Sequence, residues 1–227
     1  MDRLAGALVL RTDSAGALRA LASVRSALTE AEKARAARLR SSDDREDYFA
    51  AHLLVRECAA RWSGVPAHRL TLRQLCPGCG SPTHGRPYIE ELPWVAVSLS
   101  HTRGHVAAAA GAGPVAVDVE NHRRTALSQA ARREVLTNSE HAAIAADPDP
   151  DLAFCLRWTY KECLVKQAAA SWGQLRTVSV PQSLRPDGVP VGADMRWAVQ
   201  WVDDQGASCG TAVTTGNPVL LGFEGGT

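Results

Sequence analysis

The strongest constraint on the fold is a series of three strand-like segments between residues 95 and 120. The segments read VAVSLSH, VAAAAGA and PVAVDVE, and a turn at Arg103–Gly104 separates the first from the second. Short apolar or alternating runs of this kind are typical of strands, in which successive side chains point to opposite faces. This stretch therefore predicts β-sheet at the centre of the chain.

Helical periodicity flanks this stretch on both sides. Residues 28–62 read as two helices that break near Ser41–Ser42, and Thr29 with Glu32 has the spacing of a capping box. Gly64 and Pro66 are expected to end the second helix. Further helices are expected at 125–146 and 151–170, and further strands near the N-terminus and at 175–180, 195–202 and 208–215.

The order of elements predicts an α+β fold in two halves of similar size. We expect the halves to span residues 1–112 and 113–227 and, because no long linker separates them, to pack closely. The 227 residues are long enough for a substantial core, and 45% hydrophobic with 22% charged residues is ordinary for a globular protein.

Charge and hydropathy exclude several function classes. The formal net charge is +1, so no global field attracts nucleic acid or a membrane surface. No apolar run approaches the roughly 18 residues that span a bilayer, and the N-terminal apolar run is too short for a secretory signal. We expect a cytoplasmic protein that acts without nucleic acid or membrane.

The six cysteines suit a reducing compartment, and two of them have a recognisable spacing. Cys76 and Cys79 form a C-x-x-C pair, and His84 follows. This pattern indicates either a structural zinc site or a turn without metal. Because no fourth ligand is evident nearby, the sequence favours the turn.

Two acids lie on one face of the third strand-like segment. Asp118 and Glu120 alternate with Val115, Val117 and Val119, so the acids point one way and the valines point into a core. Two neighbouring carboxylates are either solvated or bridged by a cation. Oxygen ligands of this kind suit Mg²⁺, which often binds one or two carboxylates together with substrate phosphates.

A second polar group lies on the helix expected at 151–170. Trp158, Glu162 and Lys166 are spaced at i, i+4 and i+8 and therefore share one face. An exposed Glu–Lys pair is the simplest interpretation. Trp158, however, is expected in the core, and Leu164 and Val165 indicate a well-packed helix.

Three other motifs could bind phosphate. Ser100 and His101 end a strand, where they form either a phosphate site or a structural pair; a hydrolase is not favoured because G-x-S-x-G is absent. Gly85–Arg86 presents a cation in a tight turn. The basic residues of the first helix are either solvated or phosphate ligands, and they include Lys33, Arg35 and Arg38.

In combination and in this order, the motifs resemble those of the Sfp-type 4′-phosphopantetheinyl transferases. The family patterns G-K-P, S-x-S-H, G-[IV]-D-[VI]-E and W-[ST]-x-K-E-[AS]-x-x-K stand here as GRP at 85–87, SLSH at 98–101, AVDVE at 116–120 and WTYKECLVK at 158–166. Arg86, Ala116 and Cys163 depart from the usual Lys, Gly and Ser or Ala. The resemblance covers residues 30–170.

The resemblance implies two α+β subdomains related by a pseudo-twofold axis, with coenzyme A between them. Asp118, Glu120 and Glu162 would then hold Mg²⁺ against the pyrophosphate, which Lys166 would also contact. Ser100, His101, Gly85 and Arg86 would bind the adenosine and its 3′-phosphate. Arg35 would bind that phosphate too, assisted by Lys33 or Arg38. Glu162, Lys166 and Asp118 are thus the expected catalytic residues.

The implied reaction moves phosphopantetheine from coenzyme A to a serine of an acyl or peptidyl carrier protein. The length favours the monomeric type of broad specificity, and carriers of polyketide, nonribosomal-peptide and fatty-acid synthesis stay open. Such carriers are acidic, so steering by Arg123, Arg124, Arg132 and Arg133 is one interpretation of these residues, and a solvated face is the other. The rival functions are a metal-dependent phosphohydrolase and a non-enzymatic zinc-containing binding module.

Overall fold

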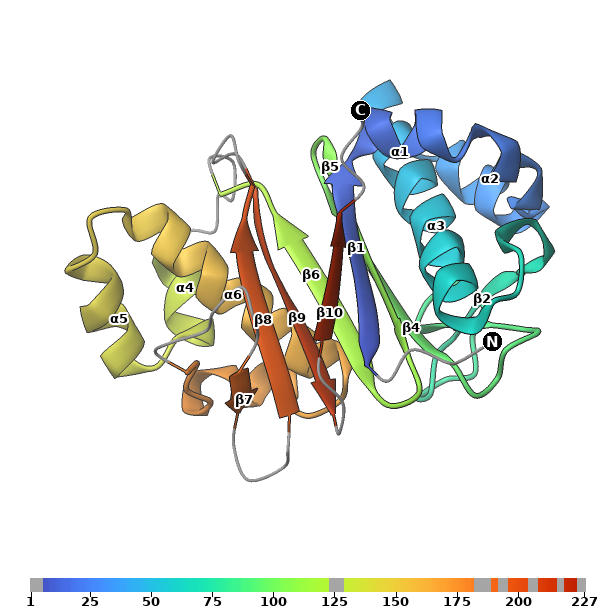
Figure 1. Ribbon diagram of the computed structural model, residues 1–227. Coiled ribbons are helices and arrows are strands. Elements are labelled where there is room, and N and C mark those ends of the chain that lie inside the picture. The colour runs from blue at the N-terminus through green and yellow to red at the C-terminus, as the bar shows by residue number, and fades with distance from the viewer. Residues whose placement is uncertain are drawn as a thin grey trace.

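The computed structural model describes residues 6–122, 129–181, 189–191, 196–203, 208–215 and 219–223. Two β-sheets lie between two groups of helices, with α1, α2 and α3 on one side and α4, α5 and α6 on the other (Figure 1). The chain is thus a mixed α and β fold, as the order of elements predicts. No helix among these residues has the length and apolar character needed to cross a membrane. A pseudo-twofold relation and the domain boundary near residue 112 stay predictions.

The first sheet has six strands in the order β10-β1-β5-β4-β3-β2. Their bounds are β1 (Ala7–Asp13), β2 (Leu72–Leu75), β3 (Arg86–Ile89), β4 (Ala96–Thr102), β5 (His105–Gly111) and β10 (Val219–Phe223). β10 runs parallel to β1 and the other neighbours are antiparallel. The helical elements of this half are α1 (Ser14–Ala20), α2 (Glu30–Ala36), α3 (Ser42–Ser63) and the 3₁₀ turns Ala22–Ala27 and Ala67–Arg69.

The second sheet has four antiparallel strands in the order β6-β9-β8-β7. These are β6 (Val115–Glu120), β7 (Val189–Val191), β8 (Arg196–Val202) and β9 (Cys209–Thr215). Its helical elements are α4 (Gln129–Val135), α5 (Asn138–Ala145), α6 (Pro150–Lys166) and a 3₁₀ helix at Trp172–Thr177.

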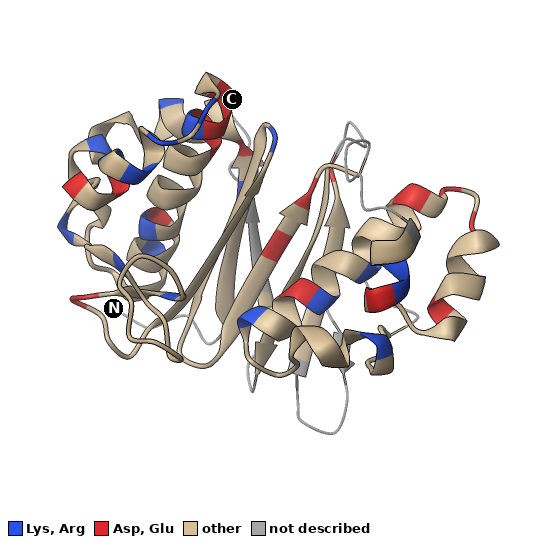
Figure 2. Cartoon of the chain, turned by 180° about the vertical axis from the view of Figure 1, so that it is seen from behind, with Lys and Arg blue, Asp and Glu red and all other residues tan. Residues whose placement is uncertain are grey.

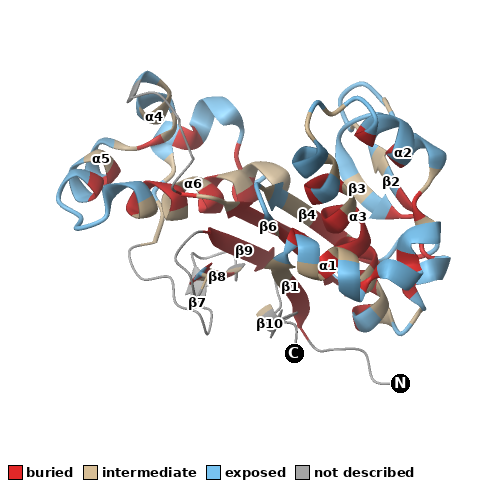
Figure 3. Cartoon of the chain, turned by 90° about the horizontal axis from the view of Figure 1, so that it is seen from above, coloured by how far each residue is buried: buried red, intermediate tan, exposed pale blue. Residues whose placement is uncertain are grey.

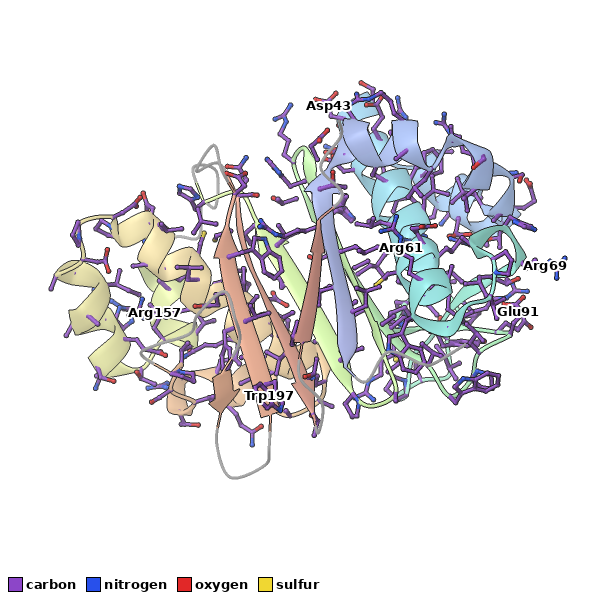
Figure 4. The ribbon with its side chains drawn as sticks, in the orientation of Figure 1. Asp43, Arg61, Arg69, Glu91, Arg157 and Trp197 are labelled. Carbon is purple, nitrogen blue, oxygen red and sulfur yellow. The ribbon has the colours of Figure 1, made fainter. Side chains whose placement is uncertain are left out.

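Strand alternation builds the core in layers. Val9, Ala107 and Ala109 face the second sheet and meet Val117 and Val119 of β6, all of them buried. The alternate residues of β1 and β5 pack on α3, and those of β6, β8 and β9 pack on α6. The four alanines of β5 leave room for a helix on one face and a sheet on the other. Buried residues therefore line the central strands (Figure 3), and side chains fill the space between the layers (Figure 4).

Side chains of β4 satisfy the free backbone edge of β6. β6 is the edge strand of its sheet and pairs only with β9 among the described residues. Its Val117 N–H donates to Ser98 Oγ at 3.1 Å, and the Asn121 N–H just beyond it donates to Thr102 Oγ1 at 3.2 Å. An edge that would otherwise bury unpaired N–H groups is thereby joined to the first sheet. This β4–β6 contact fixes where the two sheets meet.

Several helix boundaries follow the sequence signals. Thr29 and Glu32 form the predicted capping box at the start of α2, and α3 ends at Gly64, which adopts φ +80°. The strand predicted at 175–180 is wrong, because residues 172–177 form a 3₁₀ helix that begins at a Ser171–Gln174 capping box. The Val180 N–H then donates to Glu140 Oε1 instead of to a neighbouring strand. The sequence also failed to predict α1, β7 and β10, and Thr137 begins a new helix within 125–146.

A buried ionic network holds α2 on α3. Glu32 accepts from Arg56 Nη2 at 2.7 Å and from Arg56 Nη1 at 2.9 Å, and His52 Nδ1 lies 2.6 Å from Glu32 Oε1. Arg56 is fully buried. Burial acts to raise the pKa of Glu32, but hydrogen bonds from His52 and Arg56 outweigh it and lower the pKa to about 2.

The substitution Glu32→Gln should destabilise the protein by about 3 kcal/mol near pH 6, because a buried cation loses its counter-charge. The folded pKa of Glu32 lies below the ordinary value of 4.5, so its stabilisation is present above pH 4.5 and is lost as the pH falls toward 2. Urea unfolding should therefore show that the difference in free energy of unfolding between the wild type and E32Q becomes smaller from pH 6 to pH 3. The matched control Glu30→Gln, exposed on the same helix, should change stability by at most about 0.5 kcal/mol. A gap independent of pH would contradict the assigned pKa.

Candidate functional site

β6 and α6 bring the predicted acids and lysine together. Strand alternation sends Val117 and Val119 into the core between the sheets, so Asp118 and Glu120 face α6. Lys166 Nζ donates to Asp118 Oδ1 at 2.7 Å, and Trp158 Nε1 lies 3.4 Å from Glu120 Oε1. The shared helix face predicted from the spacing of α6 is therefore the face that meets β6. Acidic and basic residues are interspersed over both halves of the molecule (Figure 2). The cluster of acids on β6 and α6 is therefore local and not part of a larger acidic region.

Trp158 lies at the boundary between the core and this site, because it packs against two buried clusters and reaches Glu120. It is half-buried, stacks on Phe154 with ring centroids 6.4 Å apart, and contacts Trp172 at 5.9 Å. The expectation that Trp158 lies in the core is confirmed in part, because its ring packs against the core while its indole N–H faces Glu120. The aromatic surface beside the acids limits their contact with water on that side.

Lys166 is held by two groups of β6. Besides Asp118, it donates to the Val117 carbonyl oxygen at 2.8 Å. Desolvation acts to lower the pKa of Lys166, but the charge of Asp118 outweighs it and the pKa is raised. The ammonium group therefore stays charged at neutral pH and is fixed beside the carboxylate.

Asp118 has one satisfied oxygen and one unsatisfied oxygen. Oδ1 accepts from Lys166 and from Ser100 Oγ, the latter at 2.8 Å. Oδ2 is buried and has no hydrogen-bond partner among the described residues. A buried carboxylate oxygen without a donor costs free energy unless a ligand or cation completes its environment.

The side chains of Glu120 and Glu162 both have pKa values near neutrality. Burial first and the charge of Asp118 second raise the pKa of each to about 7, from an ordinary value of 4.5. Glu120 also adds to the rise at Glu162. The three acids therefore repel one another, and Lys166 alone does not offset that repulsion.

The chemistry of the donor set fits a hard divalent cation. Three carboxyl groups share one electrostatic environment, and one of them offers a buried, unsatisfied oxygen. Their oxygens are not, however, all within 4.8 Å of one another. Like charges separate when no cation lies between them, so the convergence of Asp118, Glu120 and Glu162 on one point stays a prediction.

A second group of predicted residues lies at the tip of the β2–β3 hairpin. Arg35 of α2 donates through Nη1 to the Thr83 carbonyl oxygen, two residues before Gly85. Gly85 has φ +105°, and a Cβ there would lie 2.4 Å from the Leu75 oxygen, so only glycine fits. Arg86 follows with an exposed side chain. The structure thus brings Arg35 and the Gly85–Arg86 turn to one edge of the molecule.

The remaining basic and polar candidates make no hydrogen bond or ion pair with the tip of the β2–β3 hairpin among the described residues. His101 packs edge-on to Tyr48 at 6.4 Å and lies within electrostatic range of Lys166 and Asp47. Lys33 is exposed and pairs with Glu30 at 2.7 Å, and Arg38 is exposed. Asp118, Glu120, Glu162 and Lys166 together are called the acid site. Ser100 is hydrogen-bonded to Asp118 of this site and not to the hairpin tip.

Three residues that support the site are assigned no role from the sequence, although Ser98 and Lys161 lie within the quoted motifs. Ser98 and Thr102 join β4 to β6, and the Thr102 hydroxyl lies 3.4 Å from Glu120 Oε2. The alternation of Ser98, Ser100 and Thr102 along one strand face was the available signal. Lys161 is fully buried and donates to Glu140 Oε2 at 2.6 Å, which ties α6 to α5. Of the predicted docking residues, Arg123 and Arg124 lie outside the described residues.

Comparison with known proteins places the acid site within a recognised family segment. The family model of the 4′-phosphopantetheinyl transferase superfamily matches residues 114–190 of the 227-residue chain. The matched segment contains Asp118, Glu120, Glu162 and Lys166. No curated protein matches the chain. The similarity points to phosphopantetheine transfer in general.

Replacing Glu162 by Gln should stabilise the metal-free protein above neutral pH. The folded pKa of Glu162 is about 7 and its ordinary value is 4.5, so the folded protein keeps a proton that the unfolded chain releases between these values. Stability therefore falls as the pH rises from 4.5 to 7. Urea unfolding in EDTA should show E162Q more stable than the wild type at pH 8, by about 1–3 kcal/mol, and equal to it at pH 4.5.

The control for this measurement is Glu134→Gln, an exposed acid on α4, which should leave stability unchanged at both pH values. An E162Q variant that is less stable than the wild type at pH 8 would show that Glu162 gains more from Lys166 than it loses to burial and to Asp118.

Proposed function

We propose that this protein transfers the 4′-phosphopantetheine group from coenzyme A to a serine of an acyl or peptidyl carrier protein. One observation carries the proposal. Inside the segment that matches the superfamily, the buried Asp118 offers an unsatisfied oxygen beside a fixed lysine and two acids with raised pKa values. Such a set of residues is better explained by the binding of a divalent cation and a diphosphate than by a solvated surface without a ligand.

The coenzyme A diphosphate would lie over the acid site. Lys166 is already charged and held by Asp118 and the Val117 carbonyl, so it would contact a phosphate oxygen without reorganisation. Arg35, Gly85 and Arg86 would bind the 3′-phosphate end, because arginine forks match phosphate oxygens. His101 lies in electrostatic range of Lys166 and would take part on the adenosine side, with Lys33 and Arg38 as exposed helpers.

Asp118, Glu120 and Glu162 are the residues that would hold Mg²⁺. The bound ion would supply charge neutralisation at the diphosphate, the usual role of a metal in phosphoryl-type transfer. Ser100 and Lys166 hold Asp118 Oδ1 in place, which leaves Oδ2 for the ion. Trp158 donates to Glu120 and orients it.

In the reaction, the serine hydroxyl oxygen of the carrier forms a bond to the β-phosphorus of coenzyme A. The bond from that phosphorus to the bridging oxygen breaks, and adenosine 3′,5′-bisphosphate leaves. Glu162 accepts the serine proton, directly or through a water. Lys166 offsets the negative charge that gathers on the phosphate oxygens.

The proposal includes the Sfp-type subfamily, with two pseudo-symmetric halves, a monomeric state and a cytoplasmic location. The motifs at residues 85–87 and 98–101 support it, because they lie outside the segment matched by the superfamily model and resemble the Sfp-type patterns.

Of the two proposed docking residues that the structure describes, Arg133 is better placed than Arg132 to steer a carrier. Arg133 is exposed on α4. Arg132 instead pairs with Asp151 at 2.9 Å and lies over the Phe154 ring at 4.2 Å, so it also supports the fold. An acidic carrier would approach this end of α4.

The direct test incubates the protein with coenzyme A, Mg²⁺ and a panel of apo carriers and measures the mass of each carrier. Transfer predicts a phosphopantetheine mass gain on at least one carrier, and D118N, E162Q and K166M should each lower its rate by about 10²-fold or more. Glu90→Gln, an exposed acid that pairs with Arg73 and lies on neither β6 nor α6, is the control and should be fully active. Cooperative urea unfolding shows that each variant is folded. Cleavage of coenzyme A without any carrier mass gain would favour a phosphohydrolase and overturn the proposal.

Charge reversal at Arg133 should slow association with an acidic carrier by about twofold to tenfold, most at low salt, because steering is screened. Stopped-flow association rates at two ionic strengths measure the effect. Arg19→Glu makes the same charge change on the exposed surface of α1 and should leave the rate unchanged. Equal losses for R133E and R19E would mean that net charge and not a docking surface controls the rate.

A further inference from the structure

The loop between β2 and β3 gathers three metal-binding side chains. One ligand atom each from Cys76, Cys79 and His84 lies within 4.8 Å of the other two, and Cys79 Sγ is 3.5 Å from His84 Nε2. A potential metal site needs three or more His, Cys, Asp or Glu side chains whose ligand atoms lie this close together. Among the described residues, these three side chains meet that condition. They lie outside the acid site and outside the segment that matches the superfamily.

The backbone of the loop holds the two sulfurs in place. The Gly80 N–H donates to the Cys76 carbonyl oxygen at 2.9 Å, and the Cys76 N–H donates to the Ser81 carbonyl oxygen at 2.9 Å. The backbone amides of Gly78 and Cys79 also interact favourably with the Cys76 sulfur. Gly80 adopts φ +70°, which turns the chain back toward His84. A loop that aims amide N–H groups at sulfur favours a thiolate, the form that binds metal.

These two cysteines differ from the other four in exposure. Cys79 is exposed and Cys76 is partly exposed, whereas Cys58, Cys155, Cys163 and Cys209 are buried. Exposed free thiols three residues apart in a folded turn would serve no packing purpose. Two sulfur ligands and one imidazole suit Zn²⁺ and do not suit Mg²⁺.

We propose that Cys76, Cys79 and His84 bind one zinc ion, with a water in the fourth position. The two thiols lose their protons on binding. The ion closes the tip of the β2–β3 hairpin, so that residues 76–84 form a fixed loop ahead of Gly85 and Arg86. Because Arg35 donates to Thr83 in the same loop, the zinc also sets the position of Arg35.

The proposed consequence for coenzyme A rests on the proposed function, whereas the zinc site itself does not. Arg35 and Arg86 would meet the 3′-phosphate only if the hairpin tip keeps its shape. Loss of zinc should therefore weaken coenzyme A binding and leave the acid site on β6 and α6 intact.

The first experiment titrates Co²⁺ into the reduced, metal-free, full-length protein and records absorption. Binding by two thiolates in a tetrahedral site predicts thiolate-to-cobalt charge-transfer bands and visible d–d bands that saturate at one equivalent, and one equivalent of Zn²⁺ should remove them. C76S, C79S and H84A should each weaken binding by about 100-fold or more, since even outer-shell losses cost 10–100-fold. His68→Ala, a histidine on an exposed turn outside the loop, is the matched control and should bind as the wild type does.

The outcomes decide the proposal without reference to activity. Absence of the charge-transfer bands in protein with free thiols at Cys76 and Cys79, or an H84A spectrum and affinity equal to those of the wild type, would overturn it. A Cys76–Cys79 disulfide formed in air would also block cobalt binding, and counting free thiols detects it. If bound zinc does not protect the two thiols from this oxidation, the zinc assignment is overturned.

The second experiment measures transfer kinetics with and without zinc. Zinc removal or H84A should raise KM for coenzyme A several-fold and leave kcat at saturating coenzyme A unchanged. A fall in kcat at unchanged KM would contradict the role given to the loop. If no protein transfers phosphopantetheine at all, the proposed function fails, and the cobalt spectra still decide the zinc site.

Discussion

The contact between Asp118 of β6 and Lys166 of α6 is the interaction on which the rest of the site depends. It joins a buried strand to the end of a 17-residue helix, and it keeps the pKa of Lys166 raised where burial alone would lower it. One oxygen of Asp118 is fully engaged by Lys166 and Ser100, and the other is left buried without a donor among the residues described. Burial first and the charge of Asp118 second raise the pKa values of Glu120 and Glu162 to about 7. This electrostatic environment would favour a positive ligand, as the proposed function requires.

The layered fold explains why this cost is tolerated. The inward face of β6 is apolar and packs between the sheets, so the strand is held by its valines and not by its acids. Its free edge is satisfied by hydroxyls of β4, which carries three polar residues on the face toward β6. Lys161 and Glu140 anchor α6 from the other side. Because the strand and the helix are each fixed by contacts outside the site, the acids can be held close together. Strain of this kind is common where a scaffold supports a functional group.

Part of this arrangement could be predicted from the sequence because it depends on local periodicity. The alternation of Asp118 and Glu120 with valines, the stripe from Trp158 to Lys166 and the capping box at Thr29 all follow from residue spacing, and the structure bears them out. The contacts of Ser98 and Thr102 with β6 could not be predicted, since they require knowing which strand of one sheet crosses the other. The strand expected at 175–180 failed because apolar spacing does not reveal that a side chain, Glu140, takes the place of a neighbouring strand. The sequence favours a turn without metal at Cys76 and Cys79 because a fourth ligand is lacking, whereas the structure brings the three candidate ligands together.

The central claim is that Asp118, Glu120 and Glu162 bind one divalent cation against the diphosphate of coenzyme A. A crystal structure with coenzyme A and Mn²⁺, which prefers the same oxygen ligands as Mg²⁺ and is located by its anomalous scattering, tests this claim most directly. The account predicts one manganese peak at coordination distance, roughly 2.0–2.3 Å, from Asp118 Oδ2 and from both glutamates, with a diphosphate oxygen completing the shell. A structure with ordered coenzyme A whose manganese peak lies elsewhere, or whose three carboxylates point away from a shared position, would contradict the account.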